Sequence, residues 1–360
     1  MTLRIFTIAL LFWFYGVALA AGPDVAEILS RDGDACYEKA RPGVPITLSS
    51  AMKAHERFRT EWWYVTGNVA DKEGRRYGYQ FTLFRRGLTC GGTEDGSSWD
   101  ARHLYFAHIA VSQEEGKRFH SEYRMERQSF DLAGWRGEGE GLSVWVNDVD
   151  LSWNGKNMRL ASTHGSPAFF LTLTPIKPPV LQGEKGYSIK DPKSGSASHY
   201  LSLPRLKTRG ILRLEGKEVV VKGLSWMDRE WSTGSLGAGQ AGWDWMALNL
   251  DDGQDLMVCR VRARKAENHV YFGSLSRADG SVKILTPEEI EMKSFGSFKG
   301  PSGARYPLRW TLSIASEELD LEVTPLFNEQ EHTQDVVYWE GAVVAKGKSL
   351  GRGYLEMTGY

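Results

Sequence analysis

The segment Arg59-Thr60-Glu61-Trp62-Trp63-Tyr64-Val65-Thr66-Gly67-Asn68 carries three consecutive large aromatic residues and has an altered second copy far downstream. That copy is Gly242-Trp243-Asp244-Trp245-Met246-Ala247-Leu248-Asn249. At one constant offset, Trp62 matches Trp243, Tyr64 matches Trp245 and Asn68 matches Asn249. A repeat of this length indicates two tandem domains rather than a short-repeat solenoid.

Strand patterns dominate both copies. Residues 77–84 alternate, which places Tyr77, Tyr79, Phe81 and Leu83 on one face of a strand. Later strands are also repeated, because residues 171–175 resemble 321–325 and residues 222–228 resemble 352–358. Further strands are expected at residues 101–112, 142–147, 149–153, 168–174, 218–231, 243–250, 255–263, 269–276, 306–314, 319–324, 337–345 and 350–358.

The sequence therefore predicts an all-β protein made of two tandem antiparallel units, packed as barrels or sandwiches. Closed barrels best avoid exposed sheet edges. The expected boundaries are an N-terminal arm at 21–54, a first barrel at 55–232 and a second barrel at 233–360. The long connection over residues 177–198 is either a lid or cap or a plain insert, and residues 287–291 indicate a short helical turn.

The N-terminus and the charge indicate where the protein works. The chain has 360 residues and a formal net charge of −1, so nothing points to a nucleic-acid or anionic-membrane partner. Residues 1–20 combine Arg4, an apolar run and a small-x-small site at Ala18-Leu19-Ala20, as a cleavable signal peptide does. We expect a periplasmic or secreted mature chain from about Ala21, with an uncleaved anchor as the alternative.

Three cysteines, Cys36, Cys90 and Cys259, leave at least one thiol unpaired. A bridge between Cys36 and Cys90 is possible, but spacing alone does not establish it.

Several motifs spread along the chain point to one family. They are His55-x-x-Phe58-Arg59-Thr60-Glu61-Trp62-Trp63-Tyr64, Pro178-Pro179-x-Leu181-Gln182-Gly183 with Gly186-Tyr187-Ser188, Trp226-Met227-Asp228-Arg229-Glu230-Trp231-Ser232, Gly242-Trp243-Asp244-Trp245, Tyr338-Trp339-Glu340-Gly341 and Gly353-Tyr354-Leu355-Glu356-Met357-Thr358-Gly359-Tyr360. Together they resemble the secreted AttH-like group of bacterial proteins, often labelled predicted secreted hydrolases, which is related to carotenoid 1,2-hydratases (hydroxyneurosporene synthases). The resemblance covers almost the whole mature chain and implies two lipocalin-like β-barrels in tandem.

The resemblance to the hydratases also implies candidate catalytic residues. Those enzymes use an Asp near the close of the first barrel with a Tyr two residues before it, and a His and a Trp about one strand-pair upstream. Here Asp228 matches the acid and His199 the histidine, while Trp226 stands at the Tyr position and Leu201 replaces the Trp. Two of four positions match, which keeps an acid and a histidine but does not specify a carotenoid substrate.

Alkene hydration needs a proton donor in a shielded pocket that tolerates a carbocation. A carboxyl group in an apolar pocket keeps its proton near neutral pH, and aromatic faces stabilise a nearby cation. Leu224, Trp226, Asp228 and Glu230 share one face of a strand, so an inward-facing strand would set Asp228 beside an indole inside the first barrel. The alternative is that Asp228 pairs with Arg59 or Arg85 and closes the barrel.

Other candidates have a ligand-binding and a structural interpretation. Lipocalin-type barrels commonly close one end with a Trp packed near an Arg, so closure is the favoured role of the acids beside the repeated tryptophans. The aromatic residues either line an apolar ligand cavity or fill the core. The ligand-binding candidates are Trp62, Tyr64, Tyr79, Phe81, Trp243 and Trp245. The barrel-closing candidates are Arg59, Glu61, Glu230, Asp244 and Glu356, with Glu340 similar to the last.

Motifs for other chemistries are weak. His103 and His108 are five residues apart on a strand and face opposite sides, so no metal is expected. The Gly-x-Ser-x-Gly at 347–351 lies between two strands and is no nucleophile elbow, and no nucleotide cofactor is expected. Three functions remain. The first is a carrier or chaperone of an apolar molecule (isoprenoid or lipid-like), for which the AttH-like resemblance implies an ABC transporter as recipient. The second is a cofactor-free hydratase using Asp228 as acid with His199 assisting, and the third is a hydrolase using an acid-activated water.

Overall fold

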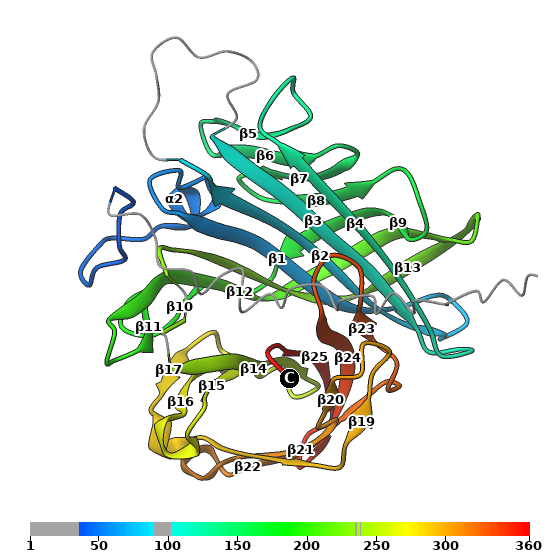
Figure 1. Cartoon of the computed structure of the whole chain (residues 1–360). Coiled ribbons are helices and arrows are strands. Elements are labelled where there is room, and N and C mark those ends of the chain that lie inside the picture. The colour runs from blue at the N-terminus through cyan, green and yellow to red at the C-terminus, as the bar shows by residue number, and fades with distance from the viewer. Residues whose placement is uncertain (1–35, 90–101, 235, 238) are drawn as a thin grey trace, which may run out of the picture.

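The computed structural model describes residues 36–360 apart from 90–101, 235 and 238. Almost all of the regular structure is antiparallel strand, in two large sheets that follow one another along the chain (Figure 1). This confirms the prediction of an all-β protein with two tandem barrel-like domains. The expected signal peptide at 1–20 and Cys90, with its possible bridge to Cys36, lie outside the described residues.

The first barrel is a curled sheet with the strand order β4-β3-β2-β1-β13-β12-β9-β8-β7-β6-β5. Strands β10 and β11 lie off this order, and each pairs with β12. Strand β6 packs across the fold against β2, β3 and β4, which encloses an interior. A short helix, α2 (Leu48–Met52), precedes the sheet. The strands are β1 (Thr60–Ala70), β2 (Arg76–Gly87), β3 (His103–Gln113), β4 (Arg118–Arg127), β5 (Ala133–Glu138), β6 (Gly141–Val146), β7 (Val149–Asn154), β8 (Met158–Ser162), β9 (Ala168–Pro175), β10 (Val180–Leu181), β11 (Tyr187–Asp191), β12 (Ser196–Leu214) and β13 (Lys217–Ser232).

The second barrel has the order β17-β16-β15-β14-β25-β24-β22-β21-β18, with β23 beside β24, and appears nearly ring-shaped in Figure 1. A 3₁₀ turn at Pro287–Glu289 agrees with the helical turn expected there. The strands are β14 (Gln240–Leu250), β15 (Asp255–Ala263), β16 (Val270–Ser276), β17 (Val282–Leu285), β18 (Glu291–Phe295), β21 (Arg309–Ile314), β22 (Leu319–Pro325), β23 (Glu331–His332), β24 (Tyr338–Gly347) and β25 (Gly351–Met357), with a separate pair β19 (Phe298–Lys299) and β20 (Arg305–Tyr306).

The two barrels repeat one topology. Strand β1 lies between β2 and β13 just as β14 lies between β15 and β25, and the repeated segments 171–175 and 321–325 fall on the corresponding strands β9 and β22. Gly223 on β13 and Gly351 on β25 also correspond, because they lie opposite Val69 and Leu250 of the opening strands. A Cβ at Gly223 would overlap the carbonyl oxygen of Asn68, and one at Gly351 would lie 3.0 Å from that of Asn249. The repeated glycine is therefore required by close packing of neighbouring backbones.

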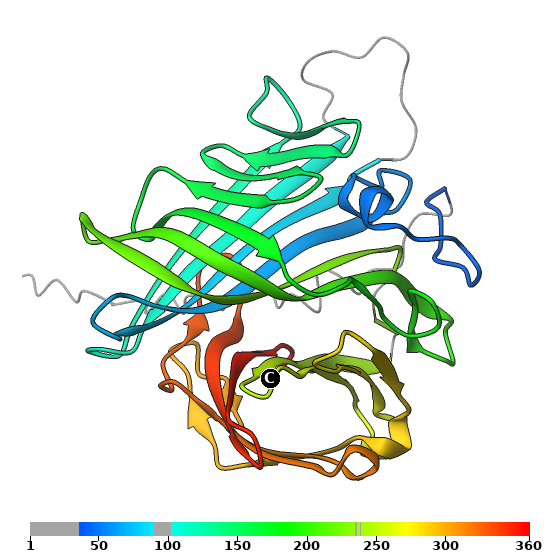
Figure 2. The ribbon, with the colours of Figure 1, turned by 180° about the vertical axis from the view of Figure 1, so that it is seen from behind.

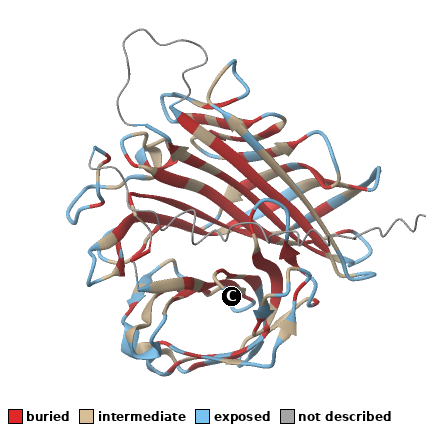
Figure 3. Ribbon diagram, viewed as in Figure 1, coloured by how far each residue is buried: buried red, intermediate tan, exposed pale blue. Residues whose placement is uncertain are grey.

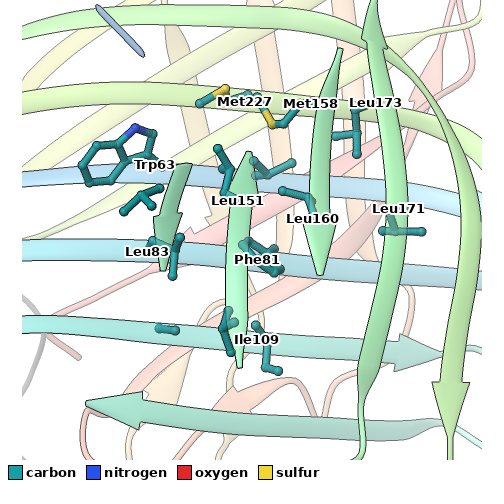
Figure 4. Packing of buried hydrophobic residues seen from close by; sticks show 14 of the residues in the cluster. Trp63, Phe81, Leu83, Ile109, Leu151, Met158, Leu160, Leu171, Leu173 and Met227 are labelled. Atoms are coloured by element: carbon teal, nitrogen blue, oxygen red, sulfur yellow. The ribbon is translucent and has the colours of Figure 1, made fainter. Parts of the chain in front are cut away.

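Alternation along the strands gives each barrel an inner and an outer face. Trp63, Phe81 and Met227 point into the first barrel, where aliphatic side chains from both layers meet them (Figure 4). A separate core fills the second barrel. A third cluster, which includes Tyr64 and Trp245, lies between the two barrels and buries their facing sides.

The junction brings the strands that open and close each barrel together. Strand β1 contacts β25, β2 contacts β24, and β12 contacts both β14 and β15. Figure 2 shows the long yellow-green strands of the first barrel above the red C-terminal strands of the second. Buried residues continue from the first barrel into the strands of the second that face it (Figure 3).

Among the described residues, no helix has both the length and the apolar character to cross a bilayer.

Candidate functional site at the junction of the barrels

A pocket of about 80 Å³ lies at the junction and draws its walls from both barrels. That volume has room for roughly five water molecules. The end of a larger molecule fits there without separation of the barrels, whereas a whole lipid does not. The lining residues are Trp62, Tyr64, Phe84, Lys190, Tyr200, Asp228, Glu230, Leu236, Trp243, Trp245, Cys259, Val261, Phe272 and Glu356.

Asp228 is the most constrained acid of this pocket, with 3% of its surface exposed. The Tyr200 hydroxyl donates to its Oδ2 at 2.6 Å, and the Ser202 hydroxyl and the Trp226 indole N–H donate to its Oδ1 at 2.6 and 2.7 Å. Burial raises the pKa of Asp228 to about 7, although these three hydrogen bonds favour the ionised form, and Glu230 raises it further. Asp228 therefore exchanges its proton near neutral pH.

The partners of Asp228 are themselves held as donors. The Gln182 amide donates to the Ser202 hydroxyl at 2.9 Å, and the Trp245 indole N–H donates to the Tyr200 hydroxyl at 3.2 Å. Each of these two hydroxyl oxygens accepts a hydrogen bond from its neighbour, so its own O–H proton is free to be donated to Asp228. Since Oδ1 accepts two hydrogen bonds and Oδ2 only one, the acid proton of Asp228 is best placed on Oδ2.

A cation lines the same pocket. The Lys190 ammonium pairs with Glu230 at 2.9 Å and lies over the rings of Tyr200 and Phe272, at 4.7 and 4.2 Å from their centroids. Lys190 comes from β11, within the 177–198 connection that sequence analysis left open between a cap and an insert. The structure lays this connection along β12 and uses it as one wall of the pocket.

The second barrel contributes its own acids. Glu356 lines the pocket, and Glu340 lies just behind it, where it accepts a short hydrogen bond from the Tyr64 hydroxyl. Burial and the neighbouring Glu356 raise the pKa of Glu340 well above its usual value. Gln80 donates to Glu340 at 3.3 Å and to the Tyr338 hydroxyl at 3.0 Å. Glu340 thus holds its proton more tightly than an exposed glutamic acid does.

His199 does not join Asp228, which corrects the catalytic pair expected from the resemblance. In the β12–β13 ladder His199 is opposite Trp231, whereas Tyr200 is opposite Glu230 and Ser202 is opposite Asp228. Neighbouring residues on a strand face opposite sides, so His199 lies on the first-barrel side of the sheet. Trp226, by contrast, does contact Asp228.

The face that carries Asp228 also differs from the expectation. One of the two sequence interpretations set Asp228 inside the first barrel, but Met227 and Trp231 fill that interior and Asp228 points outward, where the second barrel covers it. The alternative pairing with an arginine is not formed either, because Asp228 makes no arginine contact among the described residues. Arg85 instead pairs with Glu61, and Arg59 is half-buried at the entrance to β1.

Glu61 and Asp244 each form a buried ion cluster inside their own barrel. Glu61 pairs with Arg85 and Arg229, and the Arg229 guanidinium stacks over Trp63 at 3.9 Å. In the second barrel, Asp244 pairs with Arg260 and Arg262 at 2.7 and 3.3 Å. These contacts match the closing arrangement of lipocalin-type barrels and lie away from the pocket lining.

The six aromatic candidates fall into two sets. Trp62, Tyr64, Trp243 and Trp245 line the junction pocket. Tyr79 and Phe81 do not, because they point into the core of the first barrel, where both pack near Phe169.

Sequence analysis missed Lys190, Tyr200, Ser202 and Phe272. The period of two places Tyr200 and Ser202 on the face opposite His199 and Leu201, but only the β12–β13 register shows that this is the face of Asp228. Nothing in the local pattern marked Lys190 or Phe272, since their place depends on how the barrels meet. Among the described residues, no group of three or more His, Cys, Asp or Glu side chains could hold a metal ion.

Two tandem lipocalin-like barrels that share one buried acidic pocket define the class of protein, and comparison with known proteins specifies the family. The model of the AttH-like family matches residues 39–360, so the chain belongs to the AttH-like family. No curated protein matches it significantly. A crystal structure described as an AttH protein of Nitrosomonas europaea superposes with a TM-score of 0.80 at 31% identity, covering 90% of this chain and 99% of that one.

Two more distant structures share the fold. Kievitone hydratase from Nectria haematococca superposes with a TM-score of 0.65 at 15% identity, covering 92% of this chain and 98% of its own. CghA with Sch210972 superposes with a TM-score of 0.55 at 11% identity, covering 91% and 97%. At these identities the likeness extends to the fold alone.

Proposed function

We propose that this protein is a cofactor-free hydratase of the lyase class, which adds water to a double bond in an apolar, isoprenoid or lipid-like molecule. The reacting end of the substrate occupies the junction pocket, and Asp228 is the acid. One observation carries the proposal: a buried carboxyl with a pKa of about 7 opens onto a pocket walled by aromatic rings. A relative in fold bears the name of a hydratase, which is in keeping with this chemistry.

The proposed reaction has two steps. Asp228 gives its Oδ2 proton to one alkene carbon, and the other carbon becomes a tertiary cation that the faces of Trp62 and Trp245 stabilise. Water then adds to the cation, and the proton it loses returns to the Asp228 carboxylate. The three donors around Asp228 stabilise the carboxylate between these steps, so they favour the proton transfer without any metal or nucleotide.

A second candidate is a carrier that holds the same kind of ligand without converting it. The aromatic walls of the pocket favour it, because they would bind an apolar molecule whether or not Asp228 acts. The family resemblance adds an ABC transporter as the possible recipient, and the expected signal peptide places either activity in the periplasm or outside the cell. The third alternative, a hydrolase using an acid-activated water, would rely on the same Asp228, and no feature of the described pocket residues favours it over hydration.

A paired measurement separates the two candidates. Purified protein is incubated with a panel of prenylated phenols and acyclic isoprenoids in H₂¹⁸O, and products are analysed for incorporated ¹⁸O by mass spectrometry. Binding is followed by quenching of tryptophan fluorescence. A hydratase gives ¹⁸O-labelled alcohol that disappears in Asp228→Asn while quenching persists. Quenching without label in the wild-type protein would instead establish the carrier.

A further inference from the structure

A second cavity lies on the other side of the β12–β13 ladder, at the end of the first barrel. Its volume is about 370 Å³, against about 80 Å³ for the junction pocket. That size accommodates a small organic molecule rather than a few waters. The N-terminal arm and the first barrel line it through Glu38, Lys39, Arg41, Val44, Pro45, Ile46, Ser50, His55, Phe58, His199 and Trp231.

Four rings form a continuous aromatic wall in this cavity. His55 stacks parallel on Trp231 with centroids 3.9 Å apart and planes 5° apart. His199 lies 5.5 Å from Trp231, and its ring meets Phe58 edge to face at 5.6 Å. Such a wall presents flat apolar surface and ring edges together, which suits a planar aromatic ligand.

Two polar atoms on this wall have no partner. His199 Nδ1 and His55 Nε2 are buried and accept or donate no hydrogen bond within the described part of the chain. His199 is only 3% exposed. Burial lowers the pKa of His199 and brings that of His55 to about 3, so both imidazoles are neutral and each nitrogen can serve a ligand hydroxyl. Buried polar atoms of native proteins are mostly paired, so these two nitrogens, which border the cavity, are available to a ligand or a water within it.

The rim of the cavity carries positive charge. Lys39 and Arg41 are exposed, and neither forms an ion pair with another described residue, whereas the one acid, Glu38, is already paired with Arg57. The positive charges of Lys39 and Arg41 are therefore not neutralised at the rim, and they attract a carboxylate.

We propose that this cavity is a second binding site, separate from the junction pocket, for a planar aromatic carboxylic acid with a ring hydroxyl. The ring lies against the wall of His55, Phe58, His199 and Trp231, the hydroxyl reaches the free imidazole nitrogens, and the carboxylate faces Lys39 and Arg41. The site does not depend on the hydratase or carrier role, because its residues lie on the opposite face of the sheet from Asp228.

The test uses isothermal titration calorimetry of the full mature chain with 4-hydroxycinnamate and its uncharged methyl ester. Three variants are compared with the wild-type protein. His199→Phe keeps the ring but removes the nitrogens, and should weaken both ligands by about tenfold, equivalent to one lost hydrogen bond. The double variant Lys39→Ala/Arg41→Ala should weaken the acid by about tenfold and leave the ester unchanged. Asp228→Asn should change neither.

Each contrary result overturns the proposal. It is wrong if 4-hydroxycinnamate gives no binding heat at millimolar concentration, or if removing Lys39 and Arg41 leaves its affinity unchanged. It is equally wrong if Asp228→Asn weakens binding, since the ligand then occupies the junction pocket. Thermal melting checks that His199→Phe is folded, and the exposed Lys39 and Arg41 provide a second variant pair that does not touch the core.

Discussion

Asp228 in the first barrel and Glu356 in the second occupy corresponding places, and their surroundings differ. Asp228 is opposite Tyr64 of the opening strand β1, and Glu356 is opposite Trp245 of the opening strand β14. On the other side, however, Asp228 faces the hydroxyl residue Ser202, whereas Glu356 faces a second carboxyl, Glu340.

That one difference gives the acids in the two halves of the pocket different affinities for a proton. Beside Ser202 and two further donors, a single buried acid titrates near neutral pH. In the second half, burial and like-charge repulsion from Glu356 raise the pKa of Glu340. The first half can therefore release and recover a proton near neutral pH, while the second half binds its proton more tightly.

The largest test of this comparison removes one acid from each half. Asp228→Asn should lower the rate of water addition by about 10²- to 10⁴-fold, the usual contribution of a positioned general acid. Glu356→Gln should retain most of the wild-type rate. Incorporation of ¹⁸O over a single turnover measures both. Equal losses in the two variants would mean that proton transfer is shared and that the division between the halves is wrong.

The buried ion clusters extend the comparison to stability. Burial opposes ionisation of Glu61, but Arg85 and Arg229 outweigh it and lower its pKa to about 2. Glu61→Gln leaves two fully buried arginines without an anion and should cost about 3–5 kcal/mol of unfolding free energy. Asp244→Asn should cost less, because the arginines around Asp244 keep 13–14% of their side-chain surface in water. Urea unfolding of both variants gives the difference.

The depressed pKa of Glu61 also fixes the direction of a pH effect. Its contribution to stability is complete above the unfolded value of about 4.5 and is lost as the pH falls toward about 2. Wild-type protein should therefore lose stability over that interval, and Glu61→Gln should lose less. An identical acid profile for the two proteins would show that the cluster does not govern acid unfolding.

The pH dependence of the rate sharpens the assignment of Asp228. A general acid must be protonated, so the rate should be level below a pH of about 6 and fall tenfold per pH unit above about 7. Initial rates between pH 5 and 9, with circular dichroism at each pH, measure this. A rate that rises with pH instead would make Asp228 a base.

The smallest expected effect belongs to Glu340. Because its pKa is raised on folding, the folded state binds this proton more tightly, and stability falls as the pH rises above about 4.5. Glu340→Gln mimics the protonated acid and should therefore unfold at a higher urea concentration than wild type at pH 8. If the two proteins denature at the same urea concentration at pH 8, Glu340 is not held protonated.

The architecture could be predicted because duplicated, alternating segments indicate strands and their repetition without reference to distant contacts. The same period of two correctly grouped Trp226, Asp228 and Glu230 on one face. It could not say which side of the sheet that face points to, since a strand pattern defines two sets of residues and not their direction. The direction depends on the second barrel, which covers the outer side of β13.

The same limit explains the misplacement of His199. It lies beside Tyr200 in the chain, and a shift of one residue along a strand moves a side chain to the other face of the sheet. The motif resemblance located the right strand pair but carried no information on register. The role of Lys190 could not be predicted for another reason. It lies in the connection over residues 177–198, and the course of that connection is set only by its pairing with β12.

Among the hydrogen bonds that cross the junction, two run in opposite directions, one from Tyr64 of the first barrel to Glu340 of the second and one from Trp245 of the second to Tyr200 of the first. A gene fragment encoding either barrel alone would therefore yield a product with an unsatisfied acid or phenol on its largest newly exposed surface. Neither barrel can be lost or exchanged independently of the other. A substitution at a junction residue of one barrel is constrained by the residue of the other barrel to which it is hydrogen-bonded.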